Sequence, residues 1–356
     1  MESHGILSLK NFSEIDLSDT FFDGLKEDYP GFEAWFKKKS SEKAFVFYDN
    51  DGHLDGFLYT KQENEPLGDT QPNLPAAHRL KVGTFKVNAH GTKLGERFMK
   101  KIFDIAVACK ATEVYVTIFP KHAGLVGLLT RYGFKKVATK LVGSAVEDVM
   151  TRSMVELETS PIKSYPLIKL SNSTKHYLLA IFPMWHTRLF PDSILKNEDA
   201  SIVTDTSSTN SIHKVYLTSI PGMENLKTGD TIFMYRTAET GKSAEYNSVV
   251  SSLCVVEEFR WMSSFKNLED FLDYTLPYSV FTKPELVDFF AKKNYNRIIR
   301  FTYNVAFPKR VIRKSLIEDV GMSRDIRWSF FEITAQQFTK TLKLGGVDAS
   351  ITVNSP

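Results

Sequence analysis

The 356-residue chain has only two cysteines, no long run of apolar residues and almost no net charge. The cysteines, Cys109 and Cys254, are too few for a disulfide framework, and their spacing matches no metal-binding motif. We expect both to be buried free thiols, which suits a reducing compartment. No stretch approaches the 18 apolar residues of a membrane span, and the first residues lack the basic-then-apolar order of a signal peptide. The sequence therefore predicts a cytoplasmic protein that spans no membrane and holds no metal.

The composition is that of an ordinary globular protein, with 42% hydrophobic and 24% charged residues. This excludes a disordered, collagen-like or coiled-coil chain. At about 150 residues per domain, the length favours two domains. Residues 157–166 lose periodicity and contain two prolines, so we place a linker there, between domains at 1–158 and 165–356. Residues 198–211, rich in Ser, Thr and Asp, are typical of a mobile surface loop.

The first domain alternates helical and strand patterns. Its order is two short helices with aromatics at helical spacing, a hairpin around Asn50-Asp51-Gly52, a strand, a long amphipathic helix, a strand, a short helix ended by Gly133 and two strands. These nine elements, with the hairpin counted as one, span residues 16–24, 30–43, 44–60, 78–87, 94–110, 112–119, 122–134, 136–143 and 148–154 in that order.

The turn between the strand at 78–87 and the helix at 94–110 is the most informative stretch. It reads NAHGTK, and it places consecutive backbone N–H groups beside the positive end of a helix. Such an arrangement receives a phosphate or pyrophosphate, and Gly91 and Gly95 would let the backbone approach closely. Two glycines are a weak signal by themselves, so an ordinary loop and helix start stays open as the alternative.

This order of elements resembles the GNAT acetyltransferase family over about residues 5–157. The resemblance rests on YDNDGHLDGF, on FKVNAHGTKLGERFMKKIFDIA, and on EVYVTIF followed by LVGLLTRYGFKKV. The family loop, Arg/Gln-x-x-Gly-x-Gly/Ala, aligns with residues 90–95, where only the second glycine is kept. The resemblance implies acetyl-CoA as cofactor, with its pantetheine arm on the backbone of two strand residues and its pyrophosphate on the loop. The implied contacts are Phe85, Val87, Gly91, Thr92, Lys93, Leu94, Gly95, Glu96 and His122.

The catalytic residues are not identified by the resemblance. Many family members carry a Tyr that protonates the leaving thiolate five residues before the Phe of the Gly-Phe pair, and here that position is Leu129. Tyr132 falls on a different helical face, so we expect it to pack in the core. A base must still deprotonate the amine. Glu113, Lys86 and an early glutamate, Glu27 or Glu33, are candidates, and no spacing singles one out.

The second domain is predicted to be mostly β, with strands at 212–220, 230–237, 248–262 and 297–307 and four helices between and after them. The turn LKTGDTIFMY at 226–235 resembles the PUA-like group, including its ASCH and EVE branches, over about residues 165–345. That resemblance implies a curved β-barrel that binds RNA or modified bases. A hairpin turn of any β-barrel is the alternative. Together the resemblances imply an α/β chain: a GNAT-like mixed sheet with helices, followed by a smaller α+β PUA-like β-barrel.

Basic residues gather within 292–327, where ten Lys and Arg accompany three Asp and Glu. Aromatic residues lie between them, and bases stack on aromatic faces while Lys and Arg meet phosphates. We therefore predict RNA or single-stranded DNA as a partner, although a solvated basic face and buried aromatics would give the same pattern. The candidate contacts are Tyr235, Arg236, Arg310 and Trp328.

Three functional hypotheses follow. The first is an N-acetyltransferase that uses acetyl-CoA to modify an amine presented by the second domain, on RNA or linked to tRNA. The second is a nucleic-acid-binding adaptor whose first domain no longer catalyses. The third is an acetyltransferase for a protein or small-molecule amine. The sequence does not identify the acceptor or the oligomeric state.

Overall fold

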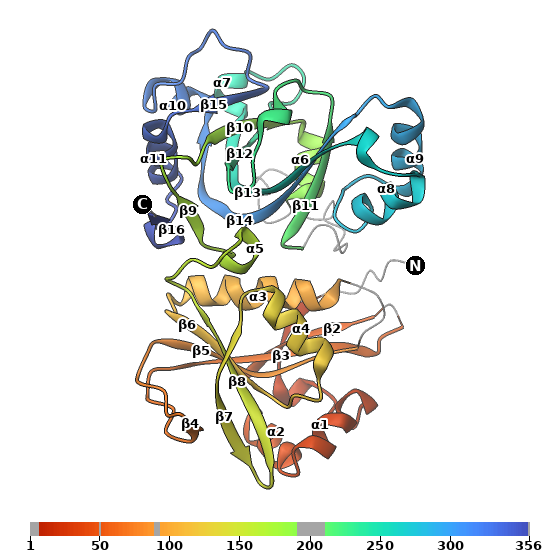
Figure 1. Ribbon diagram of the computed structural model, residues 1–356, viewed down its shortest axis with the longest axis vertical. Helices are drawn as coiled ribbons and strands as arrows, with labels where there is room; N and C mark the ends of the chain where they lie inside the picture. Colours follow the sequence, from red (N-terminus) through yellow and green to blue (C-terminus); the bar gives the residue numbers. More distant parts are fainter. Residues whose placement is uncertain (1–6, 50, 89–92, 191–210, 355–356) are drawn as a thin grey trace. The chain divides into compact units, whose positions relative to one another are not determined.

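The computed structural model describes residues 7–49, 51–88, 93–190 and 211–354, and their contacts divide the chain into two units. The N-terminal unit holds the described residues up to Met154, and the C-terminal unit those from Val155 onward (Figure 1). The second unit is the larger of the two, not the smaller as expected. None of the described helices is long and apolar enough to cross a membrane.

The N-terminal unit is built on one eight-stranded sheet in the order β1-β2-β3-β5-β6-β8-β7-β4. Every neighbouring pair is antiparallel except the parallel pair β5 and β6. The expected hairpin and the strand–helix order that follows it are confirmed. The strands are β1 (Leu7–Asn11), β2 (Lys43–Tyr48), β3 (Leu54–Glu63), β4 (Thr70–Gln71), β5 (Arg79–Val87), β6 (Glu113–Ile118), β7 (Lys135–Val142) and β8 (Ala145–Ser153).

Helices cover both faces of this sheet (Figure 1). On one face, Phe57 of β3 packs with the aromatic cluster of Phe22 and Phe36. On the other face, Phe85 of β5 contacts Phe98, with ring centroids 5.7 Å apart. We call these the α1/α2 face and the α3/α4 face. The helices are η1 (Phe12–Glu14), η2 (Thr20–Phe22), α1 (Asp23–Asp28), α2 (Phe32–Lys38), α3 (Leu94–Ala108) and α4 (Ala123–Arg131).

The predicted helix at 16–24 is only partly correct. The Asp19 side chain accepts a hydrogen bond from the N–H of Phe21 and caps the short η2, so α1 begins at Asp23. The cysteines also differ from one another. Cys254 is a buried free thiol, whereas Cys109 is partly exposed because it follows the last turn of α3.

The C-terminal unit contains a six-stranded mixed sheet in the order β11-β14-β13-β12-β10-β15 and a two-stranded pair, β16 and β9. Its four expected strands are present, and β10 and β15 were not foreseen. The strands are β9 (Ile168–Leu170), β10 (His176–Ile181), β11 (His213–Thr218), β12 (Thr231–Arg236), β13 (Val249–Trp261), β14 (Arg297–Ile312), β15 (Phe330–Ile333) and β16 (Thr352–Asn354).

The six-stranded sheet is open, with β11 and β15 at its edges, and is not the closed barrel that was expected. A barrel has one interior, but this sheet has a hydrophobic core on each face. One core includes Ile232, with Phe271 and Leu286 from helices, and the other includes Phe233 with Phe338. The helices are α5 (Pro161–Ser164), α6 (Pro183–Leu189), η5 (Met223–Asn225), α7 (Ala244–Asn247), η6 (Met262–Ser264), α8 (Leu268–Thr275), α9 (Lys283–Lys292), α10 (Arg313–Glu318), α11 (Ala335–Leu344) and η7 (Ala349–Ile351).

The LKTGD turn has a structural role in this sheet. Gly229 has a φ of +93°, which a residue with a side chain rarely adopts. The Asp230 carboxylate is buried and accepts hydrogen bonds from the N–H of Lys227, at 2.8 Å, and of Lys175, at 3.0 Å. Through the hydrogen bond from Lys175, the motif connects the start of β12 to the start of β10. The segment predicted as a mobile loop lies outside the described residues, apart from the buried Ser211.

We expect Gly56→Ala to destabilise the N-terminal unit, because its Cβ would lie 2.4 Å from Cε2 of Phe98. Overpacking of this kind costs about 1–3 kcal/mol. Gly68→Ala is the matched control, since its Cβ would meet nothing within 4 Å. Urea unfolding followed by circular dichroism measures both. Equal midpoints for the two variants would show that α3 does not lie against β3 as described.

Candidate functional site

The parallel strands β5 and β6 separate part-way along their length. Their register runs from Arg79↔Glu113 to Val82↔Val116, yet β5 continues to Val87 and β6 to Ile118. Both strands remain paired on their outer sides, β5 with β3 and β6 with β8. The sheet therefore has a gap in its interior, where backbone groups of a central strand meet no neighbouring strand.

A β-bulge lies where the strands separate. The register between β3 and β5 runs Tyr59↔Thr84 and then Thr60↔Val82, which leaves Gly83 as an extra residue. A bulge bends the strand and increases its twist. A Cβ on Gly83 would lie 2.8 Å from Cδ1 of Tyr59, so glycine allows the two strands to stay this close.

The backbone of Phe85 and Val87 faces the gap. The N–H of Asn88 donates to the carbonyl of Asp55 in β3 at 2.9 Å. Successive residues of a strand direct their main-chain groups to alternate sides, so Lys86 also faces β3, and Phe85 and Val87 face away from it. These are the two residues for which the sequence predicted a backbone role.

A pocket of about 1690 Å³ occupies this gap and reaches both faces of the sheet. On the α3/α4 face its wall includes Lys93, Gly95, Glu96, His122, Gly124 and Leu128, and on the α1/α2 face Leu25, Asp28, Tyr29, Phe32, Trp35, Tyr59, Glu63 and Glu147. Residues Val82–Asn88 and Val116–Ile118 line the passage between them. A ligand on one face can thus meet a ligand on the other through the sheet.

The starts of α3 and α4 both open into this pocket. Neither helix has a side-chain cap at its N-terminus, where the main-chain N–H groups of the first turn lack the i→i−4 partner that the rest of a helix provides. Gly95 allows close packing of the two helices, since its Cβ would lie 3.0 Å from Cδ2 of Leu128. The predicted contacts Gly91 and Thr92 lie outside the described residues.

Two of the other predicted loop contacts turn inward. Leu94 has only 2% of its surface exposed, so its side chain belongs to the core, and any ligand contact it makes comes from its backbone. Glu96 is also buried, and its carboxylate pairs with Arg131 at 3.4 Å. Lys93 is the residue of the predicted set that brings a cation to the wall of the pocket.

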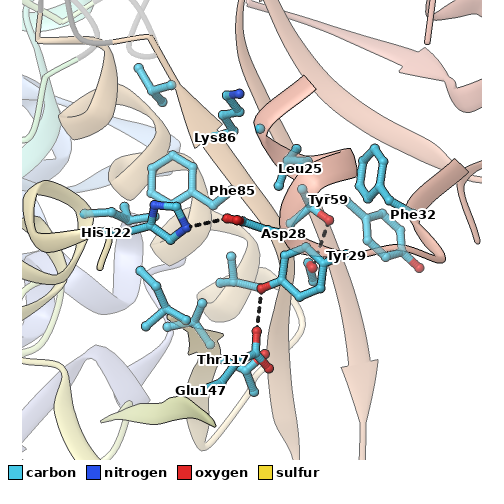
Figure 2. A pocket seen from close by; sticks show the side chains of 18 of the residues that line it. Leu25, Asp28, Tyr29, Phe32, Tyr59, Phe85, Lys86, Thr117, His122 and Glu147 are labelled. Atoms are coloured by element: carbon cyan, nitrogen blue, oxygen red, sulfur yellow. Dashed lines mark hydrogen bonds and ion pairs between the residues drawn. The ribbon is translucent and has the colours of Figure 1, made fainter. Parts of the chain in front are cut away.

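His122 lies at the start of α4 and is paired with Asp28 at the end of α1 (Figure 2). Its Nε2 is 2.9 Å from the Asp28 carboxylate, which also pairs with Lys121. Burial by itself raises the pKa of Asp28, but the hydrogen bonds from Lys121 and His122 outweigh it and hold that pKa below its usual value. Sequence reasoning named His122 but missed Asp28, because the pair joins elements 94 residues apart.

A second pair, Tyr29 and Glu147, closes the α1/α2 face of the pocket (Figure 2). The Tyr29 hydroxyl donates to the Glu147 carboxylate, and burial together with this hydrogen bond raises the pKa of Tyr29. Glu147 is only 3% exposed. Its position on β8 follows the alternation that also brings Tyr115 and Val149 to this face, so alternation is the sequence signal that could have identified it.

Some of the remaining catalytic candidates line the pocket and others do not. Leu129 and Tyr132 are fully buried and do not line the pocket, as expected for packing residues. Glu113 also lies outside it and pairs with Arg79 at 2.6 Å. Glu33 is exposed on α2 and is not part of the wall, whereas Glu27 and Lys86 are. Burial lowers the pKa of Lys86, whose ammonium lies 5.1 Å from the centre of the Phe21 ring.

The four predicted nucleic-acid contacts do not form one exposed surface. Tyr235 and Arg236 are 1% and 3% exposed, so they offer no face to a base. They are buried because β12 is covered on both faces. Arg310 and Trp328 are partly exposed. The guanidinium of Arg313 lies 4.6 Å from the Trp328 ring centre, and the Trp328 indole donates to the carbonyl of Ser323.

At least five of the ten basic residues at 292–327 form ion pairs with acidic residues. The ion pairs are Lys292–Asp288, Arg297–Glu224, Arg300–Glu257, Lys314–Glu318 and Arg324–Glu245. Three of the acidic partners come from distant segments, which the local charge count could not include. Binding of RNA or single-stranded DNA by this unit stays a prediction.

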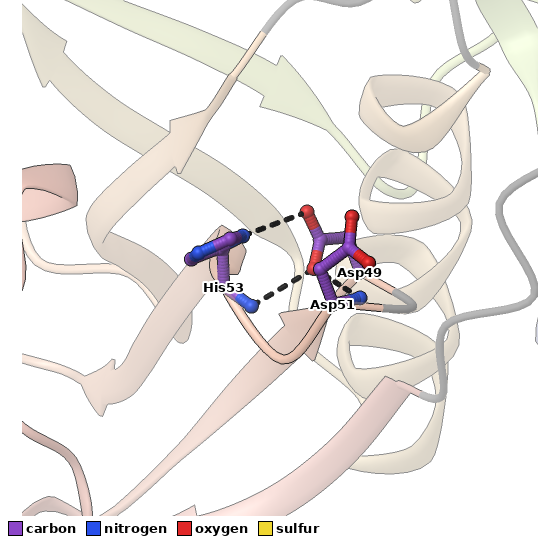
Figure 3. A group of neighbouring side chains, drawn as sticks. All are labelled: Asp49, Asp51 and His53. Carbon is purple, nitrogen blue, oxygen red and sulfur yellow. Dashed lines mark hydrogen bonds and ion pairs between the residues drawn. The ribbon is translucent and has the colours of Figure 1, made fainter.

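Asp49, Asp51 and His53 gather at the hairpin between β2 and β3, with ligand atoms within 4.8 Å of one another (Figure 3). The Asp49 carboxylate accepts hydrogen bonds from the N–H of Asp51, at 2.9 Å, and of His53, at 2.8 Å. These bonds are those of a tight turn, and Asp51 and His53 are exposed. The turn accounts for the cluster without a metal ion.

Comparisons with known proteins give structural likenesses only. No family model and no curated protein sequence matches the chain. Among solved structures, nourseothricin acetyltransferase is 19% identical with a TM-score of 0.25, covering 31% of this chain and 63% of its own. Arabidopsis thaliana Naa50, in complex with the bisubstrate analogue CoA-Ac-MVNAL, is 16% identical with a TM-score of 0.28, covering 41% and 98%. A mutant form of ZmASCH from Zymomonas mobilis is 9% identical with a TM-score of 0.31, covering 48% and 96%.

The chain thus spans less than two thirds of nourseothricin acetyltransferase. All three identities are below 25% and all three TM-scores below 0.5, a range in which likeness identifies neither a family nor an activity. The chemistry of this chain must be argued from its own pocket.

Leu129→Ala should lower the free energy of unfolding by about 2–5 kcal/mol, because it leaves a cavity in a fully buried site. Tyr132→Phe keeps the buried ring and should leave any activity of the pocket within a few-fold of the parent. Chemical denaturation measures the first change and turnover the second. A hundredfold loss of turnover in folded Tyr132→Phe would place Tyr132 in the chemistry.

Asp28→Asn should destabilise the N-terminal unit at pH 7 by about 0.5–1 kcal/mol, since the pairs with Lys121 and His122 are partly exposed. The folded state lowers the Asp28 pKa, so this stability is present above the unfolded value of 3.8 and is lost as pH falls through the folded pKa. The difference between parent and variant should therefore shrink below about pH 4. Asp23→Asn, exposed on the same helix, is the control, and a pH-independent difference for Asp28→Asn would refute the pairing.

Proposed function

We propose that the N-terminal unit is an acyl-CoA-dependent N-acyltransferase that uses acetyl-CoA as its donor. The observation that supports this most is the gap between β5 and β6, which leaves the main-chain groups of Phe85 and Val87 without a strand partner. A pantetheine arm has two amide groups, so it can pair with this backbone as an additional strand would. The gap passes through the sheet, which allows a donor on the α3/α4 face to meet an amine on the α1/α2 face.

The phosphates of the donor are assigned to the start of α3. Anions bind at helix N-termini because the first N–H groups are unsatisfied and the helix dipole is positive there. Lys93 adds a positive charge at the wall of the pocket. The start of α4, at His122 and Gly124, lines the same pocket and adds the positive end of a second helix dipole.

The reaction joins the amine nitrogen to the acyl carbon and breaks the carbon–sulfur bond of the thioester. The nitrogen must first lose a proton. The Asp28 carboxylate accepts the Nε2–H of His122, which leaves the lone pair on Nδ1 to take that proton. The nitrogen loses its second proton to solvent as the amide forms, and His122 then releases the first to solvent. The leaving thiolate, with an ordinary pKa of about 8.5, takes up one proton from solvent and needs no dedicated acid. His122 therefore acts as base, and Asp28 orients it.

The test of donor binding uses Val87, whose N–H faces the gap. Val87→Pro removes this N–H, whereas Val87→Ala keeps it and is the matched control. We expect CoA and acetyl-CoA to raise the melting temperature of the full-length parent and of Val87→Ala, because a ligand of the native state stabilises it. Val87→Pro should reduce CoA affinity about tenfold or more, the equivalent of one or two hydrogen bonds.

The outcomes separate the hypotheses. No stabilisation of the parent by millimolar acetyl-CoA would refute the proposed function. Equal affinities of the two Val87 variants would refute the pantetheine assignment. Tight binding without acetylation of any amine in a mass-spectrometric screen would identify the unit as a binding module that does not catalyse.

A further inference from the structure

The buried carboxylate of Glu147 is the feature of this pocket that the transfer reaction does not use. It is 3% exposed and forms part of the pocket wall. Its hydrogen-bond donor is the neutral Tyr29 hydroxyl, and among the described residues no Lys, Arg or His lies within ion-pair distance of it. Taking a carboxylate out of water is costly unless a cation compensates it.

Most lysines on this side of the pocket form ion pairs with other carboxylates, and Lys86 lies over the Phe21 ring, where the acids that act on it are Asp23, Asp28 and Glu27. Lys140, which opposes Glu147 across the β7–β8 pair, forms its ion pair with Asp69. Lys39 pairs with Glu42 at 2.7 Å, and Lys61 and Lys81 pair with Glu63. Glu147 is therefore the buried carboxylate on this side of the pocket that has no ion pair among the described residues, whereas Glu27, also without one, is exposed.

Aromatic side chains line the same side of the pocket as this carboxylate. They are Tyr29, Phe32, Trp35 and Tyr59, and the Tyr29 ring lies directly beside Glu147 (Figure 2). Aromatic faces attract cations, and they do so more strongly where water is excluded. Leu141 and Val142, on β7, continue the wall with apolar surface. A buried carboxylate beside aromatic rings has the chemistry that recognises an organic ammonium ion.

We propose that the acceptor is a small aliphatic diamine, and that Glu147 holds one of its nitrogens as an ammonium ion. This inference rests on the proposed function. Within the same pocket, His122 and Asp28 provide the place where the other nitrogen becomes neutral and attacks the acyl carbon. The ammonium at Glu147 keeps its protons throughout, so Glu147 is a specificity-determining residue and does not take part in the proton transfer.

The test compares 1,4-diaminobutane with butylamine, which has the same chain and lacks the second charge. The full-length protein should acetylate the diamine with at least about tenfold higher kcat/KM, as expected for a charged hydrogen bond of about 1.5–3 kcal/mol. Glu147→Gln should remove most of this preference through KM, with butylamine turnover within a few-fold of the parent. Glu65→Gln, an exposed carboxylate of the same unit that does not line the pocket, makes the same change in net charge and should keep the preference.

A second measurement does not depend on turnover. In the presence of CoA, isothermal titration calorimetry should detect binding of 1,4-diaminobutane to the parent and to Glu65→Gln, and at least about tenfold weaker binding to Glu147→Gln. If CoA binds and amines are acetylated but the two amines are used equally, the diamine assignment is wrong and the proposed function stands. Preference for a peptide N-terminus or for RNA over the diamine would also overturn it. Failure of CoA itself to bind would refute the proposed function.

Discussion

The pocket of the N-terminal unit exists because one backbone constraint bends β5. Gly83 is accommodated as an extra residue opposite β3, and the ring of Tyr59 occupies the space that its Cβ would need. The bend separates β5 from β6 beyond Val82, while the outer neighbours hold each strand in place. The bulge also shifts the side-chain alternation by one residue, so Lys81 before it and Lys86 after it both point to the α1/α2 face.

Polar pairs between layers then define the chemistry of the gap. His122 and Asp28 connect α4 to α1, and Tyr29 and Glu147 connect the end of α1 to β8. Both pairs place a carboxylate where little water reaches it, and neighbouring donors stabilise it. Because Asp28 and Tyr29 are adjacent in the chain, one short segment positions both pairs. The acceptor side of the pocket thus depends on the packing of α1 against the sheet.

The C-terminal unit shows how local patterns can mislead. The strands around LKTGD were expected to curve into a barrel, but helices cover both faces of the sheet, and each face has its own core. The same coverage buries Tyr235 and Arg236. The aromatic and basic residues of 292–327 were read as a surface, and much of that charge is neutralised by acids such as Glu224 and Glu257.

The order of helices and strands in the N-terminal unit, the Gly-containing hairpin and the buried helix α3 follow from the sequence, because apolar periodicity and turn residues act over short distances. The two backbone positions at the gap, Phe85 and Val87, were also predicted, through a resemblance. Only the tertiary structure showed that Asp28 pairs with His122, that Glu147 pairs with Tyr29, and that both carboxylates line the pocket. Their roles depend on side chains that come together from distant segments. No local sequence pattern shows that Asp28 has cationic partners and that Glu147 has none in the part of the chain that the structure describes.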